Sequence, residues 1–184
     1  MGHLSKCDRV LYFKKMKIEY YQTINDVGIV GKMNTIDEFS RIGLPSGLEN
    51  KSLLDIGCNT GAFIIEAKKR KATRVVGVEV NDDWRWLANG ILDEVGILNA
   101  KNRVYKNIDD IEGKFDIVLL LSVLHVTENP QILLDKAWEM TTELMIVEIN
   151  DRLQDTKIIL PPEAVYYGKN KDNRSVYRCF KNNI

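Results

Sequence analysis

The fold is decided by the stretch Ser52-Leu53-Leu54-Asp55-Ile56-Gly57-Cys58-Asn59-Thr60-Gly61, a short apolar strand that runs directly into a turn. Gly57 and Gly61 allow the turn to be tight, and Asn59 is one of the few residue types besides glycine that tolerate a positive φ. A helical stretch follows from Ala62 to Lys71. We therefore expect a strand, turn and helix whose free N–H groups near Gly61 suit an anionic group.

Further apolar runs of similar length occur at Arg74 to Val80, Phe115 to Leu121 and Glu143 to Ile149. Their apolar character is nearly continuous rather than alternating, which is typical of strands covered on both faces in a parallel sheet. Lys101 to Lys106 is a weaker strand between them. The order β-α-β-α-β-β-α-β predicts an α/β fold with a doubly wound, mostly parallel sheet.

Helices are expected between these strands. One carries apolar residues at helical spacing and should pack a single stripe on the sheet: Trp84, Leu87, Ala88, Ile91 and Val95. The next begins with Asn129 as cap and Pro130 in the first turn, where the missing N–H of proline costs little. Near the C-terminus, the runs 164–168 and 175–180 flank a polar turn and predict a terminal antiparallel hairpin.

The first 50 residues are expected to form a helical extension that covers the pocket as a lid, ahead of a domain at residues 51–184. A basic helix is expected from Asp8 to Tyr21, and a second helix from Thr35, where Thr35 and Glu38 make a capping box. Because the core strands begin near Ser52, deletion of residues 1–33 is expected to leave a folded sheet.

Composition indicates a single globular domain of 184 residues in which 45% are hydrophobic and 28% charged. The longest apolar run is too short to span a membrane, and no secretory signal is evident. Three cysteines without C-x-x-C pairing and two histidines argue against a metal site or a disulfide framework. We expect a cytoplasmic protein with no metal and no membrane contact.

The glycine pattern narrows the ligand. A dinucleotide fingerprint requires glycines at positions 57, 59 and 62, but Asn59 and Ala62 occupy two of them. The middle glycine, which lets the backbone approach a pyrophosphate, is absent, and no Walker-type Gly-Lys-Ser/Thr follows. A nicotinamide-dependent oxidoreductase is therefore disfavoured, whereas a nucleoside ligand without pyrophosphate fits.

Two carboxylates stand where such a ligand would bind, because ligands of open α/β sheets lie beyond the C-terminal ends of the strands. Glu79 ends the second strand, where an acid accepts hydrogen bonds from ribose hydroxyls; the alternative is a surface carboxylate. Asp55 precedes the turn, where it either receives a ligand ammonium group or has a purely structural role in the turn.

Three segments together resemble class I S-adenosylmethionine-dependent methyltransferases: Leu-Leu-Asp-Ile-Gly-Cys-Asn-Thr-Gly-Ala-Phe from Leu53, Val-Val-Gly-Val-Glu-Val from Val75, and Phe-Asp-Ile-Val-Leu-Leu-Leu-Ser-Val-Leu-His from Phe115. The resemblance spans residues 51–150 and implies a Rossmann-like fold and S-adenosylmethionine as cofactor. It places the methionine part near the turn and the ribose at Glu79, with the adenine near Asn107 and Ile108. The implied cofactor-binding residues are Asp55, Gly57, Cys58, Asn59, Gly61, Glu79, Val80, Asn107 and Ile108.

A narrower resemblance links the chain to methyltransferases that modify the wobble uridine of tRNA and to their relatives. It rests on Tyr20-Tyr21-Gln22-Thr23-Ile24 and on Val123-Leu124-His125 with Pro130. That group usually shows Tyr-His where this chain has Leu124-His125, and it carries more chain for substrate binding. The acceptor therefore stays open between a small molecule and an RNA base.

Methyl transfer depends on in-line positioning more than on acid-base chemistry, so a catalytic residue is not required. His125, after the fourth strand, is the one candidate, and it either contacts the acceptor or bonds a nearby carbonyl. No Asn/Asp-Pro-Pro-Tyr/Phe run follows that strand, which disfavours amino-methylation of adenine or glutamine. The rival hypothesis is a catalytically silent subunit that binds the cofactor and acts through an unidentified protein partner.

Overall fold

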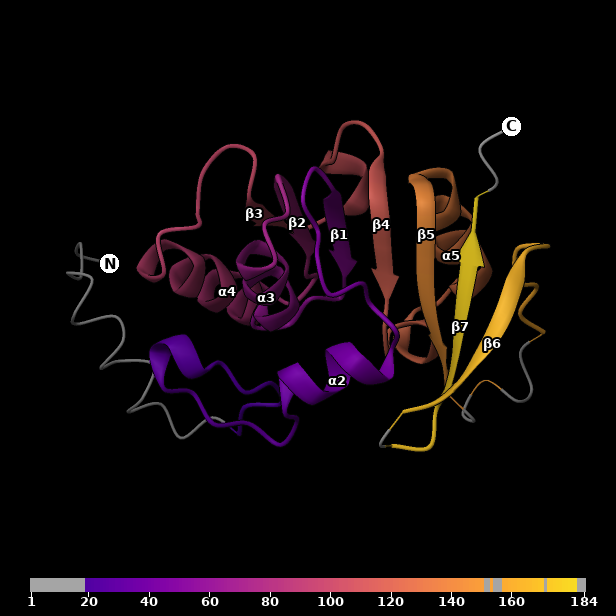
Figure 1. Cartoon of the computed structure of the whole chain (residues 1–184), viewed down its shortest axis with the longest axis horizontal. Helices are drawn as coiled ribbons and strands as arrows, with labels where there is room; N and C mark the ends of the chain where they lie inside the picture. Colours follow the sequence, from indigo (N-terminus) through magenta and orange to yellow (C-terminus); the bar gives the residue numbers. More distant parts are fainter. Residues whose placement is uncertain (1–18, 151–152, 154–156, 171, 182–184) are drawn as a thin grey trace.

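A computed structural model of the chain describes residues 19–150, 153, 157–170 and 172–181. Within them the backbone forms a seven-stranded sheet with the order β3-β2-β1-β4-β5-β7-β6 (Figure 1). The strands are β1 (Ser52–Ile56), β2 (Arg74–Val78), β3 (Arg103–Tyr105), β4 (Phe115–Leu120), β5 (Thr141–Ile149), β6 (Ala164–Lys169) and β7 (Ser175–Phe180).

The first five strands are parallel, and β7 pairs antiparallel with both β5 and β6. The strand order reverses between β1 and β4, because the chain winds from β1 through β2 to β3 and then returns to the other side of β1. This reversal opens a crevice at the C-terminal edge of the sheet. The predicted doubly wound sheet with its terminal hairpin is confirmed.

Helices cover both faces of the sheet. Helices α3 (Ala62–Lys69) and α4 (Asp82–Glu94) pack on one face and α5 (Pro130–Glu139) packs on the other, whereas α2 (Thr35–Arg41) lies beyond the C-terminal strand ends. Short 3-10 turns are η1 (Asn25–Val27), η2 (Ile108–Asp110) and η3 (Leu124–Val126). The elements expected between residues 52 and 149 are present, with ends that shift by up to two residues. Helix α3, for example, ends at Lys69 instead of Lys71, because Arg70 already leaves helical geometry.

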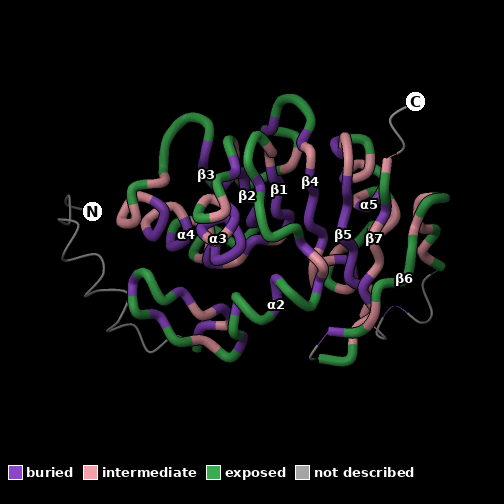
Figure 2. The backbone as a smooth tube through the Cα atoms, viewed as in Figure 1, coloured by how far each residue is buried: buried purple, intermediate pink, exposed green. Residues whose placement is uncertain are grey.

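Alternation along each strand divides the interior into two apolar layers. Leu53 and Val75 face the layer that contains α3 and α4, whereas their neighbours Leu54 and Val76 face the layer that contains Leu134 of α5. Figure 2 shows the resulting buried backbone along the central strands. Burial on both faces is the reason that the strands read as continuous apolar runs in the sequence.

The N-terminal segment, residues 19–50, lies across the C-terminal edge of the sheet (Figure 1). Its side chains Tyr20, Ile24, Ile29 and Met33 are buried in the same core cluster as Phe63 of α3. Removal of residues 19–33 would therefore expose apolar surface of the core, and whether the sheet still folds without residues 1–33 stays a prediction. Most of the helix expected from residue 8 lies outside the described residues, and residues 19–21 are not helical.

The caps of two helices differ from expectation. Asn34, not Thr35, caps α2, because the Asn34 side chain accepts a hydrogen bond from the Ile36 N–H at 3.1 Å. The Thr35 hydroxyl instead donates to the Thr23 carbonyl at 2.9 Å, so the predicted capping box is wrong. Asn129 precedes α5 as expected, but its side chain makes no capping hydrogen bond.

Candidate functional site

A cavity of about 1020 Å³ lies at the C-terminal edge of the sheet, beyond the ends of the neighbouring strands β1 and β4, where the strand order reverses. Its walls come from the ends of the parallel strands, from the N-terminal segment and from the hairpin between β6 and β7. The volume is at the upper end of the range for small-molecule sites, so there is room for a cofactor and an acceptor group together. The cavity thus occupies the place that the topology predicts for a ligand.

The turn after β1 has the conformation expected from its residues. Gly57, Asn59 and Gly61 have φ values of 79°, 51° and 80°. The N–H groups of Gly57 and Cys58 both donate to the Val78 carbonyl, at 2.8 and 3.0 Å, which ties the turn to the end of β2. A Cβ atom on Gly57 would lie 2.2 Å from a methyl group of Val123, so glycine is required there.

Glu79 immediately follows β2 and lines the cavity with only 8% of its surface exposed. One carboxylate oxygen accepts a hydrogen bond from the Asn59 N–H at 3.0 Å, and the other accepts from the Asn81 N–H at 2.9 Å. Each oxygen keeps a further lone pair that can accept a ligand hydroxyl. The alternative of a surface carboxylate is therefore excluded, and Glu79 also holds the turn in place.

Asp55 is 2% exposed, and its Oδ2 atom has no hydrogen-bond partner among the described residues. Burial raises the pKa of this carboxyl to about 7, and the nearby charge of Glu79 adds to the increase. A buried carboxylate without a partner is costly, and a cationic ligand group would relieve that cost. Asp55 thus fits the predicted contact with an ammonium group better than a purely structural role.

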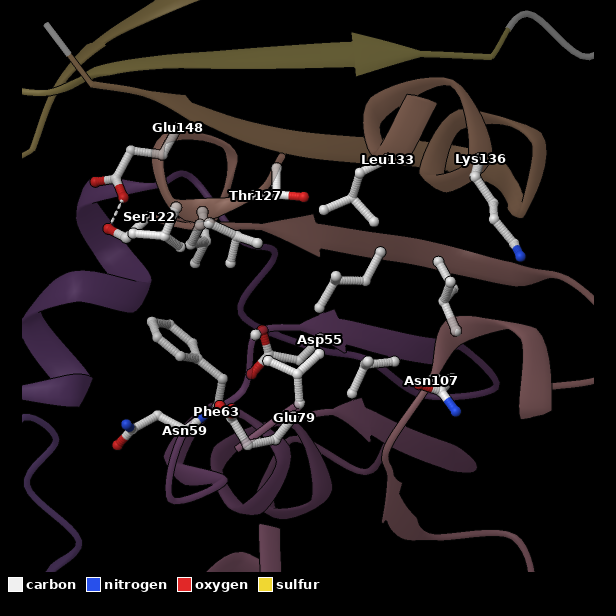
Figure 3. A pocket seen from close by; sticks show the side chains of 18 of the residues that line it. Asp55, Asn59, Phe63, Glu79, Asn107, Ser122, Thr127, Leu133, Lys136 and Glu148 are labelled. Atoms are coloured by element: carbon white, nitrogen blue, oxygen red, sulfur yellow. Dashed lines mark hydrogen bonds between the residues drawn. The ribbon is translucent and has the colours of Figure 1, made fainter. Parts of the chain in front are cut away.

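One end of the cavity is formed by residues that follow β2 and β3. Val80, Asn107 and Ile108 line it, and Val80 is 71% exposed at the rim. In Figure 3, Asn107 and Lys136 lie together at one end of the cavity, with Asp55 and Glu79 between them and Glu148. Lys136 forms an ion pair with Asp109 beside this end.

Three predicted site residues do not line the cavity. Cys58 is fully buried and packs next to Gly77, and its burial raises the pKa of the thiol. Gly61 caps α3, and a side chain there would meet Ala88 of α4. His125 is half-buried in η3, although Val126 and Thr127 beside it line the cavity. Gly57, Asp55, Asn59, Glu79, Val80, Asn107 and Ile108 do come together there.

The N-terminal segment supplies a wall of the cavity, in which Tyr21 was expected from the sequence and Gln22 was not. Gln22 is 4% exposed, and its Oε1 atom accepts hydrogen bonds from the Thr60 hydroxyl at 2.8 Å and from the Ala62 N–H at 3.2 Å. This residue therefore bonds directly to the turn and to the start of α3. Tyr21, Met33 and Glu38 line the same wall, as a lid would require.

A polar cluster at the ends of β4 and β5 was not predicted. Glu148, 4% exposed, bonds to the Ser122 hydroxyl and to the Asn170 amide, and Arg174 bonds to Ser122 and lies 3.5 Å from Glu148. Burial raises the pKa of Glu148, partly offset by Ser122 and Arg174. A signal was available in the sequence, because Glu148 interrupts an apolar run at the edge where β1 and β2 also present acids.

Comparisons with known proteins relate part of the chain to methyltransferases. Residues 54–143 match the family described as "Methyltransferase domain". Ribosomal protein L11 methyltransferase of Thermotoga maritima is 31% identical over 120 residues, which cover 58% of this chain and 40% of that protein. The corresponding protein of Thermotoga petrophila is 34% identical over 91 residues, which cover 42% and 30% of the two chains. The match therefore spans less than half the length of these relatives.

Among solved structures, magnesium protoporphyrin IX methyltransferase from Synechocystis with bound S-adenosylhomocysteine superposes with a TM-score of 0.60 at 12% identity. The match covers 84% of this chain and 90% of that one, and a likeness at such low identity concerns the fold alone. Residues 54–143 thus match a methyltransferase domain, and the likeness in structure extends to the Rossmann-like fold of methyltransferases, for which S-adenosylmethionine was expected as cofactor.

Neither a membrane-spanning helix nor a metal-binding cluster occurs among the described residues. No helix there is long and apolar enough to cross a membrane. No group of three or more histidine, cysteine, aspartate or glutamate side chains there is arranged to hold a metal ion.

Proposed function

We propose that this protein is an S-adenosylmethionine-dependent methyltransferase whose cofactor binds in the cavity beyond the C-terminal ends of β1 and β4. The observation that carries the proposal is the buried carboxyl of Asp55, a residue that lines the cavity together with Glu79 and whose Oδ2 atom has no hydrogen-bond partner among the described residues. S-adenosylmethionine carries an ammonium group at one end and ribose hydroxyls at the centre. The two carboxylates offer acceptors for these two kinds of donor.

The residues divide between the parts of the cofactor. Asp55, Gly57 and Asn59 would hold the methionine part, because Asp55 offers negative charge and Gly57 leaves space. Glu79 would accept bonds from the ribose hydroxyls while it keeps its bonds to the turn. Val80, Asn107 and Ile108 would surround the adenine. Cys58 and Gly61 would act indirectly, through the packing and conformation of the turn.

When bound, S-adenosylmethionine supplies a methyl group on a positively charged sulfur. The contribution of the protein would be to orient both reactants, which is the largest requirement of such a transfer. Gln22 and Glu79 hold the turn from two sides, so the cofactor would meet a wall that is already ordered. Preorganisation of this kind avoids the loss of binding energy in loop ordering.

The identity of the acceptor belongs to the proposal too. A small molecule and an RNA base were both expected from the sequence, and the names of the relatives above add a ribosomal protein. The narrower resemblance to the wobble-uridine group stays a prediction. His125 stays a candidate that would act only after a rearrangement, because it does not line the cavity.

The proposal is tested by mass analysis of the purified protein and by calorimetry with S-adenosylmethionine and S-adenosylhomocysteine. We expect bound cofactor or product in the purified protein and a dissociation constant that weakens in the Glu79→Ala variant. A folded parent protein that binds neither compound would contradict the proposal. Binding without any methyl transfer to fractionated cell extract would instead favour the silent cofactor-binding subunit.

A further inference from the structure

The cluster at the ends of β4 and β5 is not required by the cofactor. It consists of Ser122, Glu148, Asn170 and Arg174, and we call it the Glu148 cluster. Figure 3 shows Glu148 and Ser122 at the end of the cavity opposite Asn107 and Lys136. Ser122, Glu148 and Asn170 line the cavity, whereas Arg174 stands behind them. These polar side chains therefore line the end of the cavity that is farthest from Asn107, where the adenine is proposed to bind.

Backbone strain marks the same place. Ser122 has a φ of 56°, in the left-handed region that few residues other than glycine, asparagine and aspartate adopt. This conformation is held by the bond from the Ser122 hydroxyl to Glu148 and by the bond from Arg174 to that hydroxyl. Strained residues that persist because their surroundings fix them are concentrated at functional sites.

The cavity is strongly acidic. Six of its lining residues are carboxylic acids and two are lysines. The acids are Glu38, Asp55, Glu79, Asp109, Glu128 and Glu148. Both lysines are already paired, Lys136 with Asp109 and Lys106 with Asp82. A polyanion such as an RNA strand is repelled from such a site, whereas a cation is attracted.

Glu148 keeps acceptor capacity within the cluster. Among the described residues, its Oε1 atom accepts one hydrogen bond, from the Asn170 amide, so a second lone pair remains for a ligand donor. Arg174 is shared, since it lies 3.5 Å from Glu148 and 3.8 Å from Asp172. One cation between two carboxylates leaves a net negative charge beside the cavity.

We propose that the Glu148 cluster is the acceptor subsite and that it binds an amine, with Glu148 accepting a proton from the acceptor's ammonium group. This inference rests on the proposed function, because it takes the Asp55 side of the cavity as the cofactor site. Ser122 and Asn170 are positioning residues that hold the Glu148 carboxylate, and Arg174 holds Ser122.

The proton balance is simple. The ammonium group gives one proton to a Glu148 oxygen, which leaves a neutral amine with a free lone pair. That lone pair forms the new N–C bond to the methyl carbon as the S–C bond breaks and its electron pair passes to sulfur. The methylated amine and S-adenosylhomocysteine leave, and Glu148 returns its proton to water. The raised pKa of Glu148 supports this role, because a base is most effective when its pKa is close to the working pH.

Binding of n-butylamine tests the subsite without turnover. The parent and Glu148→Gln proteins are titrated with n-butylamine in saturating S-adenosylhomocysteine and followed by NMR, with n-butanol as the uncharged probe. We expect n-butylamine to bind the parent roughly ten- to hundredfold more tightly than the variant, because a hydrogen bond to a charged group is lost. Affinity for n-butanol should be equal in both proteins. Equal n-butylamine affinity in the two folded proteins would overturn the inference.

Matched variants guard against a loss of folding. Glu143→Gln changes a residue of the same strand that pairs with Lys51 and does not line the cavity, and it should bind n-butylamine as the parent does. Ser122→Ala removes one donor to Glu148 and leaves the carboxylate in place, so it serves if Glu148→Gln does not fold. We expect Ser122→Ala to raise the pKa of Glu148, measured from the pH dependence of n-butylamine binding. An unchanged pH dependence would contradict the positioning role of Ser122.

The result also separates this inference from the proposed function. A parent that fails to bind S-adenosylhomocysteine contradicts both, whereas a parent that binds it but binds n-butylamine no better than Glu148→Gln contradicts only the amine subsite. Methyl-labelled cofactor incubated with cell extract then distinguishes the source of the amine. Label in protease-sensitive material or in small amines supports the inference, and label released by ribonuclease overturns it.

Discussion

The two ends of the cavity are encoded in opposite ways. The Asp55 end lies within a contiguous stretch, in which Glu79 is joined to the turn by the bonds that the Asn59 and Asn81 N–H groups donate to it. The Glu148 end is assembled from β4, β5 and the hairpin turn, and Tyr21 reaches that turn from the N-terminal segment through its bond to Asp172. A local motif can be recognised in the sequence, whereas an assembled cluster depends on the whole topology.

The two ends differ electrostatically as well. Among the described residues, Asp55 has a neighbouring carboxylate and no cation that lowers its pKa, whereas Glu148 has Ser122 and Arg174 to stabilise its charge. Both carboxyls are buried, and burial is the largest cause of the raised pKa of each. The difference in partners indicates that the Asp55 end requires a cation from the ligand more strongly than the Glu148 end does.

The largest expected effect is the pH dependence of stability due to Asp55. Its pKa is about 7 in the folded protein and close to 3.9 in an unfolded chain, so between these values the folded protein binds the additional proton. The contribution of Asp55 to the free energy of unfolding therefore falls as the pH rises from about 4 to 7, by about 4 kcal/mol in total. Urea unfolding of the parent and the Asp55→Asn variant at pH 5 and pH 8 measures it.

We expect the free energy of unfolding of Asp55→Asn, relative to that of the parent, to be higher at pH 8 than at pH 5. Glu148→Gln should show a smaller change in the same direction, because Ser122 and Arg174 offset the burial of Glu148. A cation bound next to Asp55 should favour the ionised carboxylate, so cofactor binding should release a proton. Binding enthalpies that do not depend on the buffer at pH 6 would contradict this.

The second prediction contrasts the glycines of the turn. Gly57→Ala should lower the free energy of unfolding by about 2–4 kcal/mol, since the new methyl group meets Val123 and φ is positive. Gly61→Ala should lower it by only about 1 kcal/mol, because its methyl group would be in ordinary contact with Ala88 at 3.7 Å. Chemical denaturation compares them, and equal losses would show that the clash at Val123 is relieved by local movement.

The third prediction separates the two carboxylates by their effect on the cofactor. Glu79→Ala should weaken S-adenosylhomocysteine binding by about 1.5–3 kcal/mol, the range for hydrogen bonds to a charged group. Glu148→Gln should leave that affinity within about twofold of the parent value. Calorimetry on both variants measures the contrast. If the two variants weakened binding equally, the division of the cavity into a cofactor end and an acceptor end would be wrong.

The smallest effects concern the N-terminal wall. Gln22→Ala should lower the free energy of unfolding by about 1–2 kcal/mol, because the Thr60 hydroxyl and the Ala62 N–H lose their acceptor in the interior. Tyr21→Phe removes an exposed hydrogen bond to Asp172 and an interaction with Arg174, and it should change the free energy of unfolding by less than about 0.5 kcal/mol. Thermal unfolding of the two variants measures the difference. A larger loss of stability for Tyr21→Phe would mean that the contact with the hairpin stabilises the wall more than Gln22 does.

The sequence by itself determined the sheet and the turn. Continuous apolar runs fixed β1, β2, β4 and β5, because a strand buried on both faces needs apolar side chains on both. The residue types of Gly57, Asn59 and Gly61 predict positive φ values, and the structure has them. Glu79 was predictable because strand ends of a parallel sheet meet at one edge. These features depend on neighbours in the chain.

Tertiary structure alone decided the rest. Whether a residue near the turn faces the cavity depends on packing, so Cys58 and Gly61 turn to the core although they belong to the motif. The cap of α2 went to Asn34 because the Thr35 hydroxyl found the Thr23 carbonyl instead. The joining of Ser122, Glu148, Asn170 and Arg174 required the strand order to bring β4, β5 and the hairpin together, since no local pattern connects residues that lie this far apart in the chain.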